Sequence, residues 1–282
     1  MGRKQGPRKG SMQVWPRKRC YDFLPRVNWD PIISNSISLK SSHTNPTQAH
    51  LLGFVCYKVG MMSAFVKDNT ADSMTKNKKI IVPATILECP PMKILSARFY
   101  KNGKVVTEVM SEHLEKELKR AIRMPKVKIN TKEEIDKIKH EDFEDLKVIA
   151  YSEVKKIGLK KTPDISEIAI SGNKNEKIEF VKNHIGKEIT IEEVFQRGVI
   201  DIRGVTKGKG FQGAVKSFGV RLRNHKAEKG QRKVGSIGAW HPIGVRFTVP
   251  RPGQFGLFSR IAYNNSIIAV KKAADSAIIK KP

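Results

Sequence analysis

The sequence predicts a mainly β fold with an α-helical insertion and extended basic arms. Short apolar, β-branched segments separated by Gly, Pro or Asn-Gly occur in residues 51–109 and again in 163–203, a spacing typical of a small antiparallel barrel. Between them, residues 110–162 carry helix-capping residues and mixed charge. Residues 204–260 and the N-terminus are rich in Gly, Lys and Arg, which favours extended segments over regular structure.

The N-terminal extension, residues 1–50, opens with a basic stretch. Residues 1–26 hold eight Lys/Arg and one acidic residue, and Gly and Pro recur too often there for a helix. An unstructured tail is one interpretation. Aromatic residues interleaved with the charges favour a second one, an arm that becomes ordered when its rings stack on nucleotide bases. These aromatic residues are Trp15, Tyr21, Phe23 and Trp29.

Residues 51–109 are expected to form the first part of the barrel. Four segments have the composition of strands: Leu51–Val59, Lys79–Glu88, Ile94–Tyr100 and Val105–Val109. Asn102-Gly103 lies between the last two, and these residue types suit the two central positions of a type I′ hairpin turn, which need positive φ. We therefore predict an antiparallel hairpin there.

Residues 110–162 are predicted to be an α-helical insertion. Residues 108–160 carry 13 Lys/Arg and 12 Asp/Glu, and mixed charge at helical spacing is typical of a solvated face. Ser111 can cap a helix that ends before Pro125, and Thr131 with Glu134 can form a capping box for a second helix. This insertion is the part that we least expect to be buried in nucleic acid.

Residues 163–203 are predicted to complete the barrel. Ile165–Ile170 and Val199–Val205 have the pattern of strands. Between them, Asn175–His184 has the spacing of a helix and is followed by Gly186 as a C-cap. Thr190 and Glu193 form a further capping box.

The overall charge restricts the class of partner. The chain has 282 residues, with 54 Lys+Arg against 27 Asp+Glu, and a formal net charge of +27. Such an excess repels itself in a compact state unless a polyanion neutralises it. No apolar run approaches the length of a membrane span, and no apolar stretch follows the basic N-terminus as in a secretory signal. We expect nucleic acid as the partner and no membrane.

The charge is concentrated in the extension formed by residues 204–260. From Arg203 to Arg251 there are 12 Lys/Arg and one acidic residue, Glu228, together with nine Gly. We expect that such a stretch cannot build its own core. It can instead thread between RNA helices, with each cation close to a phosphate.

No catalytic, cofactor or metal site is indicated. Gly208–Gly213 matches GxGxxG, but a dinucleotide site needs an apolar helix next and an acidic residue about 20 positions later, and the chain has neither. Cys20, Cys56 and Cys89 are far apart and form no CxxC pair, which argues against a disulfide framework or a zinc finger. We expect a non-enzyme without cofactor or metal, whose thiols are small buried apolar groups.

Trp240 has two interpretations. It lies between glycines and a proline inside the cationic stretch. A tryptophan can anchor the core of a barrel, or it can stand at a loop tip and insert among RNA bases. Its position in the sequence favours neither.

Several long motifs resemble the family of large-subunit ribosomal protein three. The resemblance is carried by Asp201–Gly213, by Arg223-Asn224-His225-Lys226 and by Arg232–Pro242, and it covers nearly the whole chain. Bacterial members have Asn-Gln where this chain has Trp240-His241, so the resemblance is to the archaeal and eukaryotic cytosolic type. Eukaryotic members have a modifiable His at the position of Glu228, and that modification is not expected here.

The resemblance implies a translation-protein-like β-barrel with the insertion beside it. It implies that the N-terminal arm and residues 204–260 penetrate large-subunit rRNA, and that residues 261–282 return to the barrel. In this last segment the sequence departs from the usual ending of the family. The family is a structural constituent of the large subunit in the cytoplasm. Its members bind early in assembly, touch neighbouring ribosomal proteins, and influence the regions of tRNA and elongation factors, with no role on DNA. An extra-ribosomal basic RNA-binding protein is the alternative.

Charge and resemblance together predict a set of rRNA-binding residues. The tip of the extension, Trp240, is expected to approach the peptidyl transferase centre. The whole set is Arg8, Lys9, Arg17, Lys18, Arg19, Arg203, Lys207, Lys209, Lys216, Arg221, Arg223, His225, Lys226, Lys229, Arg232, Lys233, Trp240, His241, Arg246 and Arg251.

Overall fold

The computed structural model describes residues 15, 17–38, 49–125, 130–138, 142–195, 198–227 and 229–272. The chain divides into two compact units. We call Arg26–Ile200 with Ser266–Pro282 the sheet unit, and Met1–Pro25 with Asp201–Asn265 the basic unit. Predictions on Arg8, Lys9 and residues 273–282 lie outside the described residues. None of the described helices is both long and apolar enough to cross a membrane.

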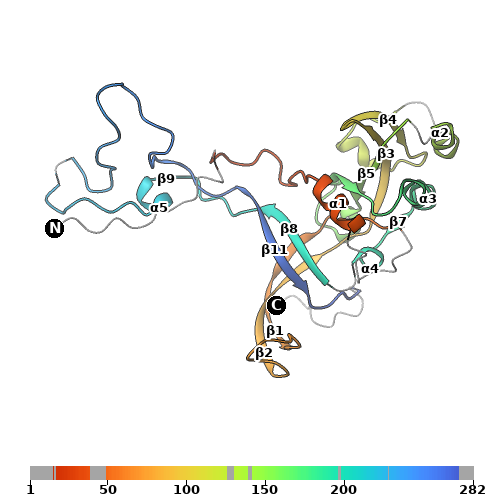
Figure 1. Ribbon diagram of the computed structural model, residues 1–282, viewed down its shortest axis with the longest axis horizontal. Helices are drawn as coiled ribbons and strands as arrows, with labels where there is room; N and C mark the ends of the chain where they lie inside the picture. Colours follow the sequence, from red (N-terminus) through yellow and green to blue (C-terminus); the bar gives the residue numbers. More distant parts are fainter. Residues whose placement is uncertain are drawn as a thin grey trace. The chain divides into compact units, whose positions relative to one another are not determined.

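Strands make up most of the regular structure (Figure 1). The first part of the chain contains, in order, α1 Asp30–Ser38, β1 Tyr57–Lys67, β2 Lys79–Glu88, β3 Met92–Lys101, β4 Lys104–Met110, the 3₁₀ helix η1 Lys116–Arg120, α2 Thr131–Lys137, β5 Asp145–Ser152, the 3₁₀ helix η2 Val154–Ile157, β6 Ile165–Ala169, α3 Lys174–His184, β7 Glu188–Ile189 and α4 Ile191–Val194. There follow β8 Gly198–Val205, β9 Phe211–Gln212, α5 Ala214–Phe218, β10 Gly253–Gln254 and β11 Ser259–Ile267.

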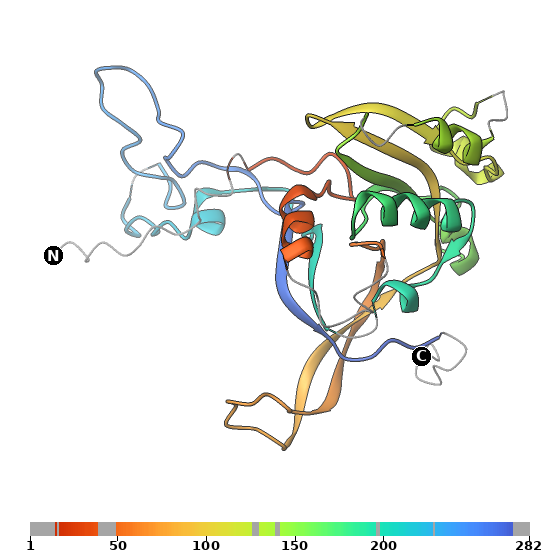
Figure 2. The same ribbon diagram turned by 45° about the vertical axis from the view of Figure 1, so that its right-hand side comes forward.

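The core of the sheet unit is a five-stranded antiparallel sheet. Four strands are ordered β4-β3-β5-β6, and β7 also pairs with β3. Strands β3 and β5 lie in the middle of the sheet, and most of their side chains are buried, including Phe99 and Val148. Helix α3 packs beside these two strands (Figure 2). The predicted strands over 79–88, 94–100, 105–109 and 165–170 are thus confirmed within a residue or two at most ends.

Local turn and capping predictions are also confirmed. Asn102 and Gly103 have φ values of 51° and 71°, and they join β3 to β4 as the type I′ turn requires. Thr190 and Glu193 form the capping box of α4. Gly186, just beyond α3, has a φ of 76°.

The predicted helical insertion is only partly helical. The helix expected from Ser111 is reduced to η1, with Glu115 as its N-cap residue. The Ser111 amide donates to Leu95 O over 2.8 Å and prolongs the sheet pairing. Helix α2 begins at Thr131, with Asn130 as its N-cap residue, whereas we expected Thr131 to cap it. Strand β5 is a central strand of the sheet, because the apolar run in Leu146–Tyr151 is buried there.

No closed barrel is found in the described part of the chain. Strands β1 and β2 pair with each other from Tyr57↔Glu88 to Lys67↔Lys79 and form a separate hairpin. Strand β8 pairs with β11, and β9 with β10, in two further two-stranded sheets. A barrel needs one continuous hydrogen-bonded ring of strands, and these four sheets do not share such a ring.

Trp29 belongs to the sheet unit and is not part of a base-stacking arm. Its side chain is 7% exposed, and its indole Nε1–H donates to Glu167 O over 2.8 Å. A Cβ added at Gly53 would overlap the Trp29 ring, so the glycine provides the space that the indole fills. Tyr21 and Phe23 are exposed, and their stacking on RNA stays a prediction.

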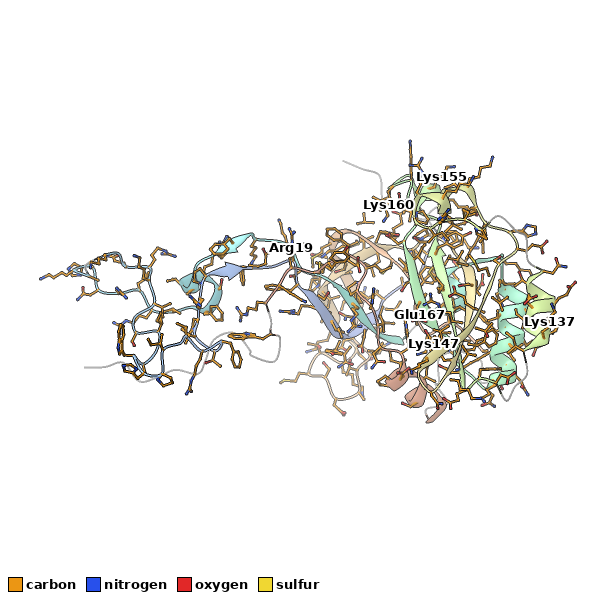
Figure 3. The ribbon with its side chains drawn as sticks, turned by 90° about the horizontal axis from the view of Figure 1, so that it is seen from above. Arg19, Lys137, Lys147, Lys155, Lys160 and Glu167 are labelled. Atoms are coloured by element: carbon orange, nitrogen blue, oxygen red, sulfur yellow. The ribbon has the colours of Figure 1, made fainter. Side chains whose placement is uncertain are left out.

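Several charged side chains of the sheet unit form ion pairs with one another. Lys147 Nζ lies 2.7 Å from Asp30 Oδ1 and 4.8 Å from the centre of the Tyr100 ring; Figure 3 labels Lys147 on β5 and Glu167 on the neighbouring strand β6. Lys93 Nζ lies 2.6 Å from the buried Glu153. Burial lowers the pKa of Lys93, but hydrogen bonds to Glu115 and Glu153 outweigh it and raise that pKa above its usual range.

Candidate RNA interface

The basic unit has a small apolar core that we did not expect from its composition. Phe218 is 8% exposed, and Ala214 and Phe258 are also buried. The Trp15 ring meets Phe218 edge-on at 6.5 Å between centroids and Phe247 at 5.5 Å. Residues 204–260 do not build this core by themselves, because their widely spaced aromatic residues gather around Trp15 of the N-terminal arm.

Arg17 joins the N-terminal arm to the extension. Its guanidinium carbon lies 4.1 Å from the centre of the Phe218 ring, and Nη1 donates to Ser217 O over 3.4 Å. Cations over aromatic faces are attracted by the ring quadrupole. Arg17, predicted as an RNA ligand, therefore also has a structural role inside the basic unit.

The GxGxxG segment is a structural turn. Thr206 N donates to Phe258 O and Lys209 N to Phe255 O, both over 2.9 Å, and Phe255 N donates to Gly210 O over 2.9 Å. A dinucleotide site would need free amides in this turn and a longer helix after it. Because the Lys209 amide is already used and α5 has only five residues, the geometry agrees with the rejection of a nucleotide site.

Gly256 permits the close approach of the two chain segments in this turn. It has a φ of 74°. A Cβ at this position would overlap Lys207 O and lie 3.0 Å from Lys209 N. Both are backbone atoms, so no side-chain rotation can relieve the overlap.

We expect Gly256→Ala to open this turn. Left-handed backbone at a non-glycine residue costs about 1–3 kcal/mol, and the overlap adds to this, so amide hydrogen exchange at Lys209 and Phe255 should accelerate roughly tenfold or more. Gly253→Ala is the control, because a Cβ at Gly253 meets nothing within 4 Å. Equal exchange in both variants would contradict the assigned role of Gly256.

Nearly all the predicted RNA-binding residues that are described are exposed. Arg17 and Arg223 are half-buried. Arg223 Nη2 donates to Val234 O over 2.8 Å and its amide to Gln231 O over 3.1 Å, so this residue closes the loop between positions 223 and 234. The exposed members are Lys18, Arg19, Arg203, Lys207, Lys209, Lys216, Arg221, His225, Lys226, Lys229, Arg232, Lys233, Trp240, His241, Arg246 and Arg251.

The described cations of the extension form no ion pairs with described acidic residues. None of the described Lys and Arg residues from Lys207 to Arg251 forms an ion pair with a described acidic residue. Arg203, at the start of the stretch, is not included in this statement. In the sheet unit, by contrast, several lysines form ion pairs, among them the half-buried Lys93 and the buried Lys177. An uncompensated positive surface is the electrostatic footprint of a polyanion-binding protein.

Trp240 lies in an exposed loop. Its side chain is 79% exposed, and Ile237, Ile243 and Val245 beside it are exposed as well. Among the described residues, its ring contacts that of the adjacent His241, edge-on at 6.3 Å between centroids. The interpretation of Trp240 as a core anchor is therefore wrong. An exposed apolar loop among cations suits insertion into a partner that has both phosphates and base faces.

The described residues hold no group of three or more His, Cys, Asp or Glu that could bind a metal ion. The candidate RNA interface consists of exposed cations, glycine-rich backbone and exposed aromatic rings.

Comparison with known proteins identifies the family. Residues 1–280 match the family described as Ribosomal protein L3. The chain belongs to the ribosomal protein L3 family. This confirms the resemblance seen in the long motifs of the extension.

Curated L3 relatives cover almost the whole chain. The large ribosomal subunit protein uL3 of Methanocaldococcus jannaschii is 38% identical over 280 residues, which is 95% of this chain and 79% of that protein. Those of Archaeoglobus fulgidus and Pyrobaculum islandicum are 35% and 38% identical, over 94% of this chain and 78% of each relative. These L3 relatives are archaeal, in agreement with the expectation drawn from Trp240-His241.

Proposed function

We propose that this chain is a structural constituent of the large ribosomal subunit and binds rRNA through its basic unit. The observation that carries the proposal is the set of exposed cations in the extension, which form no ion pair with a described acidic residue, in a chain of the L3 family. Each such cation can contact a phosphate and release counterions. The role is structural and not enzymatic.

Glycine-rich backbone supports the same proposal. The segment from Gly204 to Gly244 alternates cations with glycines, so its backbone can pass close to RNA where side chains would collide. A protein built this way joins RNA helices to each other, which suits a component that enters early in assembly. Neighbouring ribosomal proteins then become its further partners, and it resides on the ribosome in the cytoplasm.

The loop that carries Trp240 is proposed to lie near the peptidyl transferase centre. The exposed indole can stack on a base or fill a gap between rRNA segments. It would act by packing and positioning, because indole N–H is only a donor and supplies no acid–base chemistry. Through this loop and the body of the protein, the chain would influence tRNA entry and the region of elongation factors.

Replacing Trp240 tests the loop. In large subunits assembled with Trp240→Ala, we expect higher chemical reactivity of rRNA bases at the catalytic centre, since base–aromatic stacking contributes about 1–3 kcal/mol per base. Trp240→Phe keeps a ring and should remain close to the wild type. Unchanged reactivity in the alanine variant would contradict this placement of the loop.

Sedimentation tests the broader proposal. A ribosomal constituent stays with the large subunit through a high-salt wash on a sucrose gradient. Release into the free-protein fractions, with RNA binding kept, would favour an extra-ribosomal RNA-binding protein instead.

A further inference from the structure

Two of the three cysteines meet at the base of the β1–β2 hairpin. Strands β1 and β2 are antiparallel, and their first pair is Tyr57↔Glu88. Cys56 directly precedes β1 and Cys89 directly follows β2, so the two cysteines are the next residues outward from the pair Tyr57↔Glu88. Their thiols are hydrogen-bonded to each other.

The geometry of facing strands suits a disulfide. Residues directly opposite each other in an antiparallel pair have Cα atoms about 4.5–5.5 Å apart. A disulfide accepts Cα separations of about 4.4–6.8 Å. No backbone movement beyond the normal spacing of the two strands is therefore required to join Cys56 and Cys89.

The two thiols are half-buried, and the hydrogen bond between them shifts their pKa values in opposite directions. Both are reduced in this structure. The hydrogen bond from Cys89 lowers the pKa of the Cys56 thiol, whereas the same bond raises that of Cys89. Because the thiolate is the nucleophile in thiol–disulfide exchange, Cys56 is the residue expected to react first.

We propose that Cys56 and Cys89 form a redox pair that closes into a disulfide across the base of the hairpin. The oxidant is a low-molecular-weight disulfide. The Cys56 thiolate attacks one of its sulfurs, the S–S bond breaks, and one thiolate leaves. Cys89 then loses its proton and attacks the mixed disulfide, which releases the second thiolate. The two cysteines lose two electrons and two protons, and the small disulfide is reduced to two thiols.

The disulfide would join the two strands of the hairpin at its base. A two-stranded hairpin is marginally stable by itself. At the base of this hairpin, the Tyr57 hydroxyl is hydrogen-bonded to Ser152 at 2.8 Å and to Asp164, and Val55 N donates to Met92 Sδ over 3.4 Å. A covalent link at Cys56–Cys89 lies between these contacts, so it would lock the strand register next to the point where the hairpin is attached.

Titration of the full-length chain with oxidised glutathione tests the proposal. Free thiols, counted after denaturation, should fall from three to one, and peptide mapping should find Cys56 linked to Cys89. In Cys20→Ser the same linked peptide should form. In Cys56→Ser and in Cys89→Ser it should be absent. Trypsin cleavage in the hairpin tip after Lys76 or Lys78 should leave fragments that separate only on reduction.

Several outcomes would overturn the proposal. One is that Cys56 and Cys89 carry separate glutathione adducts without a link between them. Another is that both stay reduced while Cys20 reacts, or that the linked peptide contains Cys20. Each of these results can be read on folded wild-type protein, so the proposal does not depend on the folding of any variant.

Discussion

Raising the salt concentration from about 50 to 200 mM is expected to weaken binding of the purified chain to large-subunit rRNA by roughly three to five decades. The extension carries 12 Lys/Arg between Arg203 and Arg251, and about ten phosphate contacts give a loss of that size. The measurement is a binding titration at several salt concentrations with a fixed RNA fragment. A flat salt response would exclude recognition through the phosphate backbone.

Two variants that remove the same number of charges test whether the salt dependence of RNA binding comes from the extension. Changing Lys226, Lys229, Arg232 and Lys233 together to Gln should reduce the slope of log affinity against log salt by about 3–4. The control changes four cations of the sheet unit that are also exposed: Lys58, Lys104, Lys119 and Lys161. Both variants lose the same net charge, so an equal loss of slope would show a non-specific charge effect.

Trp29→Ala is expected to lower the free energy of unfolding of the sheet unit by about 3–5 kcal/mol. The indole is buried, fits against Gly53, and donates a hydrogen bond to Glu167 O on strand β6. Its removal leaves both a cavity and an unpaired carbonyl. Urea unfolding followed by far-ultraviolet circular dichroism measures the loss, and Trp29→Phe should give an intermediate value because it restores most of the volume without the donor.

Trp240→Ala is the matched control for that experiment. Because its side chain is exposed in a loop, we expect its removal to change the stability by no more than about 0.5 kcal/mol. We therefore expect Trp29→Ala to change the free energy of unfolding, and Trp240→Ala to change the reactivity of the rRNA around the loop. Comparable destabilisation by both substitutions would refute the assignment.

Local chemistry was enough to predict the short-range features of the fold. Asn102-Gly103 forms its turn and Thr190 with Glu193 caps its helix, because in each case the residues that interact are within three positions. Strand β2 was predicted from Lys79 to Glu88 and is found there. The prediction for the insertion was less accurate. The short apolar run in Leu146–Tyr151 suits either a buried strand or a helix, and only its pairing with β3 decides between them.

The sequence by itself determined the charge of this protein, its glycine-rich extension and, through long motifs, its family. These are properties of composition and order, and folding does not change them. Only the tertiary structure decided which of two tryptophans is buried, that Trp15 packs on Phe218, and that Cys56 faces Cys89. The physical reason is that burial and contact depend on partners far along the chain, such as Glu167 for Trp29, and no local pattern specifies them.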